Sequence, residues 1–201
     1  MLEEERFWLE RIISIILILL STLSCSSISS VVSMVGNAGI SSKGFKSSLN
    51  DSYIKTKIVT NISMLDIDNL TNVAVNISQG KVLLTGYIDN YDERLEIVRN
   101  VWNVDGVKEI INELKINNTV SLSDRTSDFM LKTKINTQLL FKSGINSNNY
   151  NVDVVDGEVY IIGFAENLDE KIEVEKLLSN LGGISKLVSV IDIPKNVKTD
   201  R

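Results

Sequence analysis

The segment QGKVLLTGY at residues 79–87 decides the fold, because it returns 77 residues later as DGEVYIIGF at 156–164. Two further pairs keep the same offset without a gap: IKTKI at 54–58 with LKTKI at 131–135, and DGVKEII at 105–111 with GGISKLV at 182–188. A fixed offset shared by three separate motifs is the signature of a duplicated unit. We therefore interpret the chain after about residue 50 as two copies of one module.

The quoted segment itself predicts a β-hairpin. Gln79-Gly80 and Asp156-Gly157 stand where a two-residue turn needs positive φ, and strands are expected to leave these turns at 81–88 and 158–164. Before each turn, apolar residues alternate as they do in a strand: Val73, Val75 and Ile77, then Tyr150, Val152 and Val154. A third strand is expected at 107–116 in the first copy and at 184–193 in the second.

Each copy also predicts two helices. Apolar residues recur at helical spacing before the hairpin (Ile54 and Ile58; Leu131, Ile135 and Leu139) and after it (Ile97, Val101 and Val104; Val174, Leu178 and Leu181). Asp51 and either Ser127 or Asp128 are suitable N-caps for the first helices. Gly106 and Gly183 are expected to end the second helices as left-handed caps.

The expected order in each copy is αββαβ, an α+β fold with two helices on one face of a three-stranded mixed sheet. This order, with Gly-Lys-Val or Gly-Glu-Val in the hairpin and Gly-Val or Gly-Ile before the last strand, resembles the BON domain, named for bacterial OsmY and nodulation proteins. The resemblance covers residues 51–193. It implies a non-enzymatic module that faces the periplasm, binds phospholipid and supports envelope integrity.

The N-terminus predicts an export signal. The apolar run at 12–23 is too short to span a bilayer as a helix but suits a signal-peptide core. Ser24-Cys25 follows it and resembles a lipobox, in which Cys25 would receive lipid. The acidic segment before the run departs from the usual pattern, so an uncleaved anchor, a start site misplaced upstream and an incidental cysteine remain open.

Two such modules behind a lipobox resemble tandem-BON outer-membrane lipoproteins of the DolP/YraP type. The expected organisation is a signal peptide at 1–24, a lipidated and flexible tether at 25–50, modules at 51–117 and 128–193 joined by a linker at 118–127, and a tail at 194–201. The expected location is the periplasmic face of the outer membrane.

The composition argues against an enzyme. The chain has no histidine and a single cysteine, so the commonest general base and a cysteine-based zinc cluster are both missing. Its net charge of −5 does not favour nucleic acid as a partner. The acidic stretches at 89–93 and 166–170 open the second helices, where the helix dipole favours carboxylates. We expect no catalytic residue, metal or cofactor.

Candidate lipid-binding residues come from a difference between the copies. Phe129 and Met130 stand where the first copy has Ser52 and Tyr53, and Lys132 and Lys134 follow them. Exposed apolar side chains beside lysines suit the surface of an anionic membrane. The alternative is that Phe129 packs back on its own helix as a hydrophobic staple and that Met130 fills an edge of the core.

A second difference suggests that the modules pack together. Val98 and Trp102 align with Glu175 and Ser179, so the first copy has an unmatched apolar patch on its second helix. The second copy has Val155, Ile162 and Val190 where the first has Ser78, Thr85 and Glu113. We hypothesise that Val98 and Trp102 face the back of the second sheet. The alternative is an extended core within each copy.

These expectations favour a membrane-anchored phospholipid-binding lipoprotein that supports outer-membrane integrity. Its expected partner is an anionic phospholipid membrane. The alternative function is a protein-interaction scaffold of the cell envelope, in the secretion or cell-wall machinery, for which lipid serves only as the anchor.

Overall fold

The computed structural model describes residues 42–65, 67, 72–116 and 121–194, which belong to one compact unit, Ser42–Arg201. Cys25 and the expected signal peptide lie outside these residues. The first repeat contains α2 (Ser42–Ser63), β1 (Val73–Ser78), β2 (Lys81–Ile88), α3 (Tyr91–Trp102) and β3 (Glu109–Ile116). The second contains α4 (Leu122–Phe141), the short 3₁₀ helix η4 (Ser147–Asn149), β4 (Tyr150–Val155), β5 (Glu158–Phe164), α5 (Leu168–Ser179) and β6 (Lys186–Asp192).

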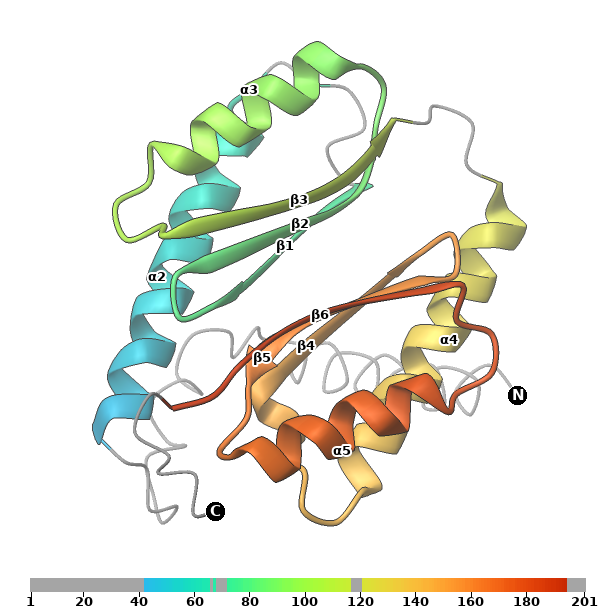
Figure 1. The fold of residues 1–201 in the computed structure, drawn as a ribbon. Helices are drawn as coiled ribbons and strands as arrows, with labels where there is room; N and C mark the ends of the chain where they lie inside the picture. Colours follow the sequence, from blue (N-terminus) through green and yellow to red (C-terminus); the bar gives the residue numbers. More distant parts are fainter. Residues whose placement is uncertain (1–41, 66, 68–71, 117–120, 195–201) are drawn as a thin grey trace, which may run out of the picture. The chain divides into compact units, whose positions relative to one another are not determined.

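Each repeat has the predicted αββαβ order and a mixed three-stranded sheet. The central strand pairs antiparallel with the first strand and parallel with the last, so the sheet orders are β1-β2-β3 and β4-β5-β6. The register is the same in both sheets: Val75 lies opposite Leu84, and Val152 opposite Ile161. Figure 1 shows that the two helices of each repeat lie on the same face of its sheet. The predicted fold class is confirmed.

The hairpin turns have the predicted left-handed backbone. Gln79 and Gly80 have φ values of 55° and 82°, and Asp156 and Gly157 have 55° and 70°. Two successive residues with positive φ are the mark of a type I′ turn, whose twist matches that of the strands it joins. The two turns therefore set the register that places alternate residues of each strand on opposite faces.

Asp51 and Asp128 do not cap their own helices, which is a correction to the prediction. Both lie inside a helix, and their carboxylates accept hydrogen bonds from the hairpin instead. Asp51 accepts from the backbone N–H groups of Gln79 at 2.7 Å and Gly80 at 2.8 Å. Asp128 accepts from Asp156 and Gly157, both at 2.8 Å. Each first helix is thereby fastened to the turn of its own repeat.

The first helices are also longer than predicted. Helix α2 begins at Ser42, within the segment expected to be a flexible tether. Helix α4 begins at Leu122, within the expected linker, and its N-cap is Ser121, whose hydroxyl accepts from the N–H of Asp124 at 3.1 Å. The apolar spacing that located these helices marks only their buried part, so it misses polar turns that lie in solvent.

The second helices end differently from the prediction. They are capped by Asn103 and Asn180 in right-handed conformations, whereas Gly106 (φ 96°) and Gly183 (φ 98°) adopt the left-handed region in the turn that follows. A Cβ at Gly106 would lie 2.8 Å from the Cδ1 atom of Ile54. Gly106 thus does not end the helix. It lets this turn approach α2 closely.

Glutamates in the first turns of α3 and α5 form a variant of the capping box, shifted by one residue. Asn90 and Asn167 accept from the N–H groups of Glu93 and Glu170 at 3.0 and 2.9 Å. The two glutamates reach back to accept from the N–H groups of residues 89 and 166 at 3.0 and 2.7 Å. This reciprocal pattern satisfies N–H groups that lack partners within the helix, so these carboxylates have a structural use.

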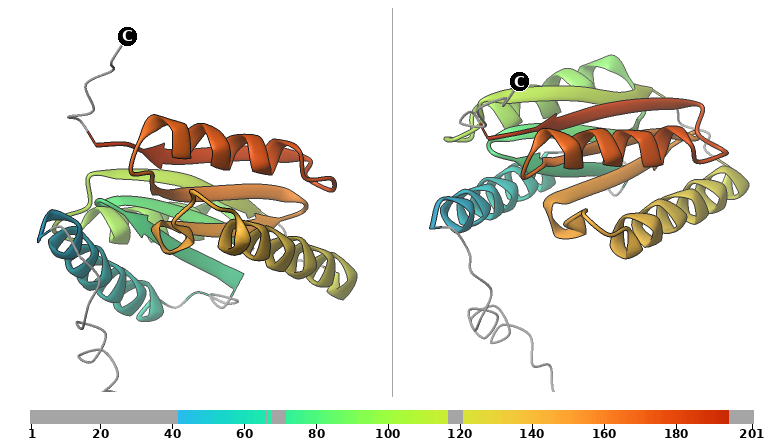
Figure 2. Two further views of the ribbon diagram at one scale, coloured as in Figure 1. Left: turned by 90° about the horizontal axis from the view of Figure 1, so that it is seen from below. Right: turned by 60° about the horizontal axis from the view of Figure 1, so that its bottom comes forward.

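Each repeat has its own core between helices and sheet, and Figure 2 shows these layers from two further directions. In the first repeat the core includes Ile54, Ile58, Val82, Leu84 and Ile97, all fully buried. In the second, the corresponding core includes Ile135, Val159, Ile161, Val174 and Leu178. The strand residues between these positions point to the opposite face of each sheet, away from the helices.

Candidate membrane-binding surface and the contact between the repeats

Besides Leu122, the first residue of α4, which is 83% exposed, the outward face of this helix carries four exposed apolar side chains. Phe129 is 68% exposed, Met130 66%, Leu140 63% and Phe141 80%. Monomeric soluble proteins seldom leave several large apolar side chains together in water, so such a surface usually has a binding role. Neither alternative for Phe129 and Met130, a hydrophobic staple or a filled core edge, matches this exposure.

Helical geometry places these four residues in two pairs on one face. At 100° per residue, Phe129 and Leu140 point in nearly the same direction, as do Met130 and Phe141. Eleven residues at about 1.5 Å per residue place Leu140 and Phe141 roughly 16 Å along the helix from Phe129 and Met130. The buried residues Ile135 and Leu139 lie on the opposite side. We call Phe129, Met130, Leu140 and Phe141 the outer face of α4.

The two candidate lysines lie in different surroundings. Lys134 is exposed, near the outer face. Lys132 turns toward the sheet, where its Nζ atom lies 3.0 Å from Oδ1 of Asp153. The carboxylate of Asp153 is buried and also accepts a hydrogen bond from the hydroxyl of Thr85 in the first repeat. The structure therefore does not bring the two lysines together.

At the four equivalent positions the first repeat is less apolar, although Leu49 of α2 is a further exposed apolar side chain there, at 53%. The positions of Phe129 and Leu140 are occupied there by Ser52 and Ser63, and those of Met130 and Phe141 by Tyr53 and Met64. Tyr53 is 57% exposed, and the ammonium group of Lys57 lies 5.7 Å from the centre of its ring. The face with four large apolar residues belongs to the second repeat.

The outer faces of the two sheets meet in a third buried cluster. The cluster includes Leu83 and Tyr87 from the first repeat and Val155, Tyr160 and Ile162 from the second. Its partly buried members are Ile111, Val188 and Val190. The structure thus brings Val155, Ile162 and Val190 together against the first repeat, on the sheet face opposite their own helices.

Val98 and Trp102 do not take part in this contact, and the hypothesis needs a correction. Val98 packs against the core of its own repeat, and Trp102 is 52% exposed. Helix α3 covers the inner face of its sheet, so its residues lie on the other side of that sheet from Leu83 and Tyr87 (Figure 1). The partner of the second sheet is the first sheet.

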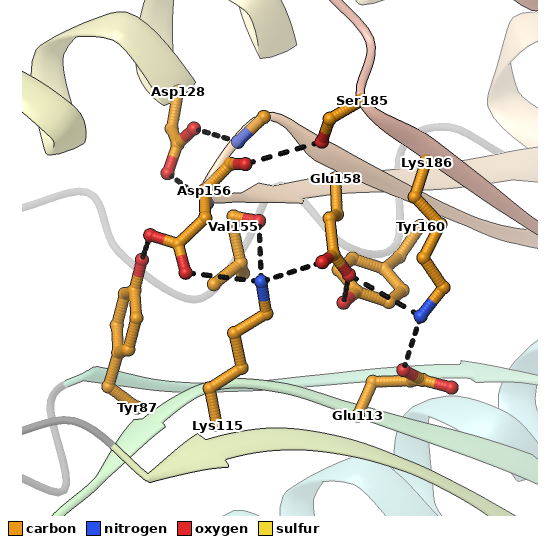
Figure 3. A network of polar contacts seen from close by, with 11 residues as sticks. Tyr87, Glu113, Lys115, Asp128, Val155, Asp156, Glu158, Tyr160, Ser185 and Lys186 are labelled. Atoms are coloured by element: carbon orange, nitrogen blue, oxygen red, sulfur yellow. Dashed lines mark hydrogen bonds and ion pairs between the residues drawn. The ribbon is translucent and has the colours of Figure 1, made fainter.

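Ion pairs lie beside Tyr87, Val155 and Tyr160 of the apolar cluster, as Figure 3 shows. Lys115 of β3 lies 3.1 Å from Asp156 and 3.1 Å from Glu158. Lys186 of β6 lies 3.5 Å from Glu113 and 3.4 Å from Glu158. Each lysine therefore forms an ion pair with at least one carboxylate of the other repeat. Partly exposed pairs of this kind contribute about 0–1 kcal/mol each, so their main effect is to fix orientation.

Buried tyrosines connect the cluster to the charged residues. The hydroxyl of Tyr87 donates to Asp156, and that of Tyr160 donates to Glu158 at 2.6 Å. Burial, reinforced by these carboxylates, raises the pKa of both tyrosines above the ordinary value. The hydrogen bond from Tyr160 and the nearby Lys115 ammonium lower the pKa of Glu158. Both effects hold the tyrosines neutral and the carboxylate charged.

Sequence reasoning missed the residues that the first repeat contributes to this contact. From the sequence, Thr85 and Glu113 stand out only as the polar equivalents of Ile162 and Val190. In the structure, Thr85 donates to Asp153 and Glu113 pairs with Lys186. One signal could have revealed the contact. Residues 82–84 and 159–162 are unbroken apolar runs, which are typical of strands buried on both faces.

A hollow lies beside the N-terminal half of α4. Its lining includes three aspartates, each already held. Asp124 accepts from the Ser121 hydroxyl, Asp128 from the hairpin N–H groups, and Asp156 from Tyr87. Among the described residues, no group of three or more His, Cys, Asp or Glu side chains is arranged to hold a metal ion.

Membrane contact by a spanning helix also finds no support in the residues that the structure describes. None of their helices combines the length and apolarity that crossing a bilayer requires. A surface contact through the outer face of α4 needs no such helix, because an amphipathic helix can lie in the plane of the interface.

Comparison with known proteins identifies relatives along most of the described chain. An Anaplasma centrale protein, described as an uncharacterized protein in the gshII 5′ region, is 30% identical over 144 residues, which are 71% of this chain and 94% of that protein. The outer membrane lipoprotein DolP of Haemophilus influenzae is 24% identical over 111 residues, 55% of this chain and 57% of DolP. The osmotically-inducible protein Y of Escherichia coli is 22% identical over 143 residues, 69% and 70% of the two chains.

A similar solved structure is the C-terminal domain of CdsD, a structural protein of the type III secretion system of Chlamydia trachomatis. Its TM-score is 0.28 at 14% identity, and the match covers 73% of this chain and 67% of that chain. The BON domain family itself matches twice, over residues 50–118 and 127–195. Since these two matches cover well over half of the sequence and coincide with the two repeats of the structure, the chain belongs to the BON domain family and carries two such domains in tandem.

Proposed function

We propose that this protein binds phospholipid membranes through the outer face of α4 and supports the integrity of the outer membrane. The observation that carries the proposal is the exposure of Phe129, Met130, Leu140 and Phe141, from 63% to 80%, on the side of the helix opposite its core. The relative named as an outer membrane lipoprotein is consistent with this role.

Apolar insertion has to supply most of the affinity. Residues 25–201 carry a net charge of −3, because −2 of the chain's −5 lies in residues 1–24, so the overall electrostatic effect of the mature protein on an anionic bilayer is repulsive. One exposed lysine near a membrane contributes about 1 kcal/mol. Full burial of a Leu, Met or Phe side chain contributes about 1.5–3 kcal/mol, so four such residues can outweigh the repulsion. Lys134 is the lysine placed to meet a phosphate, whereas Lys132 is held by Asp153.

A lipid anchor would make this weak contact effective. We propose that Cys25 is acylated at the mature N-terminus and holds the protein at the periplasmic face of the outer membrane. A single acyl chain gives only marginal binding, so a second contact through α4 adds to it by raising the effective concentration. Mass spectrometry of the mature N-terminus tests the anchor. An unmodified Cys25, or retention of residues 1–24, would refute it.

The surface is tested with residues 42–201, which form one compact unit, and anionic vesicles of phosphatidylethanolamine and phosphatidylglycerol. We expect Phe129→Glu/Met130→Glu to weaken vesicle binding at least about tenfold, because two inserted side chains are lost. The matched control is Ser52→Glu/Tyr53→Glu, which adds the same charge at the equivalent positions of the first repeat. Equal losses in the two variants, or no loss in either, would exclude the outer face of α4.

A further inference from the structure

Helix α3 carries a second exposed apolar stripe that lies away from the outer face of α4. Tyr91 is 75% exposed, Leu95 47% and Trp102 52%, and Val98 between them is half-buried. At 100° per residue these four side chains fall within about 60° of one another. The contact between the sheets does not use them. The proposed lipid contact does not use them either, so the stripe needs its own explanation.

The spacing of the stripe is that of a helix-pairing seam. Its residues follow one another at intervals of 4, 3 and 4, the pattern in which side chains of one helix fit between those of a second helix. The second repeat breaks this pattern. Its equivalents of Val98 and Trp102 are Glu175, which accepts from Ser189 at 2.8 Å, and Ser179. Leu168 and Ile172 keep the first two positions of the stripe, at 42% and 50% exposure, so only its C-terminal half, Val98 and Trp102, is specific to α3.

The charges beside the seam select the partner. Asp92 and Arg99 are exposed, stand seven residues apart and flank the stripe on one side, and Arg94 flanks it on the other. If two α3 helices packed parallel, Arg99 of each would face Arg94 of the other. If they packed antiparallel, Asp92 of each would lie beside Arg99 of the other. The helix is thus complementary to a second copy of itself in one orientation.

We propose that two molecules associate through their α3 helices, packed antiparallel, with Leu95 and Val98 at the centre and each Tyr91 near the other molecule's Trp102. A helix of 12 residues is about 18 Å long, so the contact is smaller than a standard interface and the dimer is weak in solution. Confinement to one membrane would raise the effective concentration of both molecules. The proposal does not depend on which residues bind lipid.

Analytical ultracentrifugation of residues 42–201 tests the dimer, at concentrations from about 10 μM to about 1 mM, the range expected for a small interface. We expect the average mass to rise toward that of a dimer, and Leu95→Glu to weaken association at least about tenfold. The matched control is Ile172→Glu, at the equivalent exposed position of α5. A wild-type unit that stays monomeric, or an equal effect of both variants, would overturn the proposal.

A charge exchange tests the orientation. Arg99→Asp should weaken association, and Asp92→Arg/Arg99→Asp should restore it, because the exchange rebuilds both ion pairs in the antiparallel arrangement. Trp102 is the only tryptophan in residues 42–201, so its fluorescence reports directly on the seam. A spectral shift that requires vesicles, and does not follow protein concentration, would assign the stripe to a membrane instead and refute the dimer. Failure to restore association would likewise refute it.

Discussion

Lys132 and Asp153 form an ion pair of 3.0 Å that joins α4 to the contact between the two repeats. The same carboxylate accepts a hydrogen bond from the hydroxyl of Thr85, so Asp153 contacts both the helix α4 of its own repeat and the sheet of the first repeat. A buried carboxylate is tolerated only when its partners compensate for lost hydration. The role of Lys132 that the structure supports is therefore to neutralise Asp153, which leaves its ammonium group occupied.

We expect Lys132→Met to lower the free energy of unfolding by about 1–2 kcal/mol, because it leaves the buried carboxylate of Asp153 without its cation. The loss is no larger because Lys132 is partly exposed, and ion pairs in contact with water are weak. Lys134→Met removes the same charge from an exposed position, so it should leave stability unchanged and weaken vesicle binding. Urea denaturation and vesicle co-sedimentation of both variants check this. Equal stability losses would show that the Lys132–Asp153 pair has no special weight.

Asp51 and Asp128 give a second prediction, since each carboxylate accepts two backbone hydrogen bonds from a hairpin turn. Removing the acceptor leaves two N–H groups without partners. We expect Asp51→Ala and Asp128→Ala each to cost about 1–3 kcal/mol in urea denaturation. Asp51→Asn, which keeps one acceptor oxygen, should lose less. Glu96→Ala on the exposed side of α3 is the control, and a loss as large as that of Asp51→Ala would contradict this account.

Local patterns predicted the elements and the inner faces of the sheets but not what meets the outer faces. Val82 and Leu84 fall on the helix side because side chains alternate along a strand. The partner of Thr85, by contrast, cannot be read from the local sequence, because Asp153 is 68 positions away in the chain. The local sequence favours Asp51 as an N-cap for the same reason, since its hairpin partners lie 28 and 29 positions away. Apart from the unbroken apolar runs at 82–84 and 159–162, contacts at such separations leave no mark on the local sequence pattern.

The candidate lipid surface was predicted in part. Phe129 and Met130 stood out because the equivalent residues of the first repeat are polar or smaller. Leu140 and Phe141 directly follow Leu139, a residue of the predicted apolar stripe, so the sequence alone does not distinguish them from core residues. In the structure, α4 ends at Phe141, and the side chains of Leu140 and Phe141 both stay in solvent.

The pH dependence of stability follows from Tyr160 and Glu158. The pKa of Tyr160 is raised from 10.0, so its contribution is complete below pH 10 and is lost as the pH rises further. The pKa of Glu158 is lowered from 4.5, so its contribution is complete above pH 4.5 and is lost as the pH falls further. With no histidine in the chain, stability should change little between these limits.

Thermal denaturation at a series of pH values measures this profile. Tyr160→Phe removes the hydroxyl that donates to Glu158. We expect the variant to lose less stability than the wild type above pH 10, although Tyr87 continues to contribute there. A variant profile that superimposes on the wild-type alkaline limb would assign that limb to other groups.

The contact between the sheets predicts coupling between residues that belong to different repeats. Leu83 and Ile162 are fully buried in the shared cluster, whereas their neighbours Leu84 and Ile161 are equally buried but face separate cores. Each change to alanine should cost about 2–5 kcal/mol. Because a shared cluster makes mutational effects non-additive, we expect a coupling of about 0.5–3 kcal/mol for Leu83→Ala with Ile162→Ala and additive losses for Leu84→Ala with Ile161→Ala.

Urea denaturation of the four single and two double variants measures both cycles, and Ile162→Val and Ile161→Val can replace the larger truncations if a double variant is unfolded. Additive losses in the first cycle would mean that the sheets do not share a core in solution.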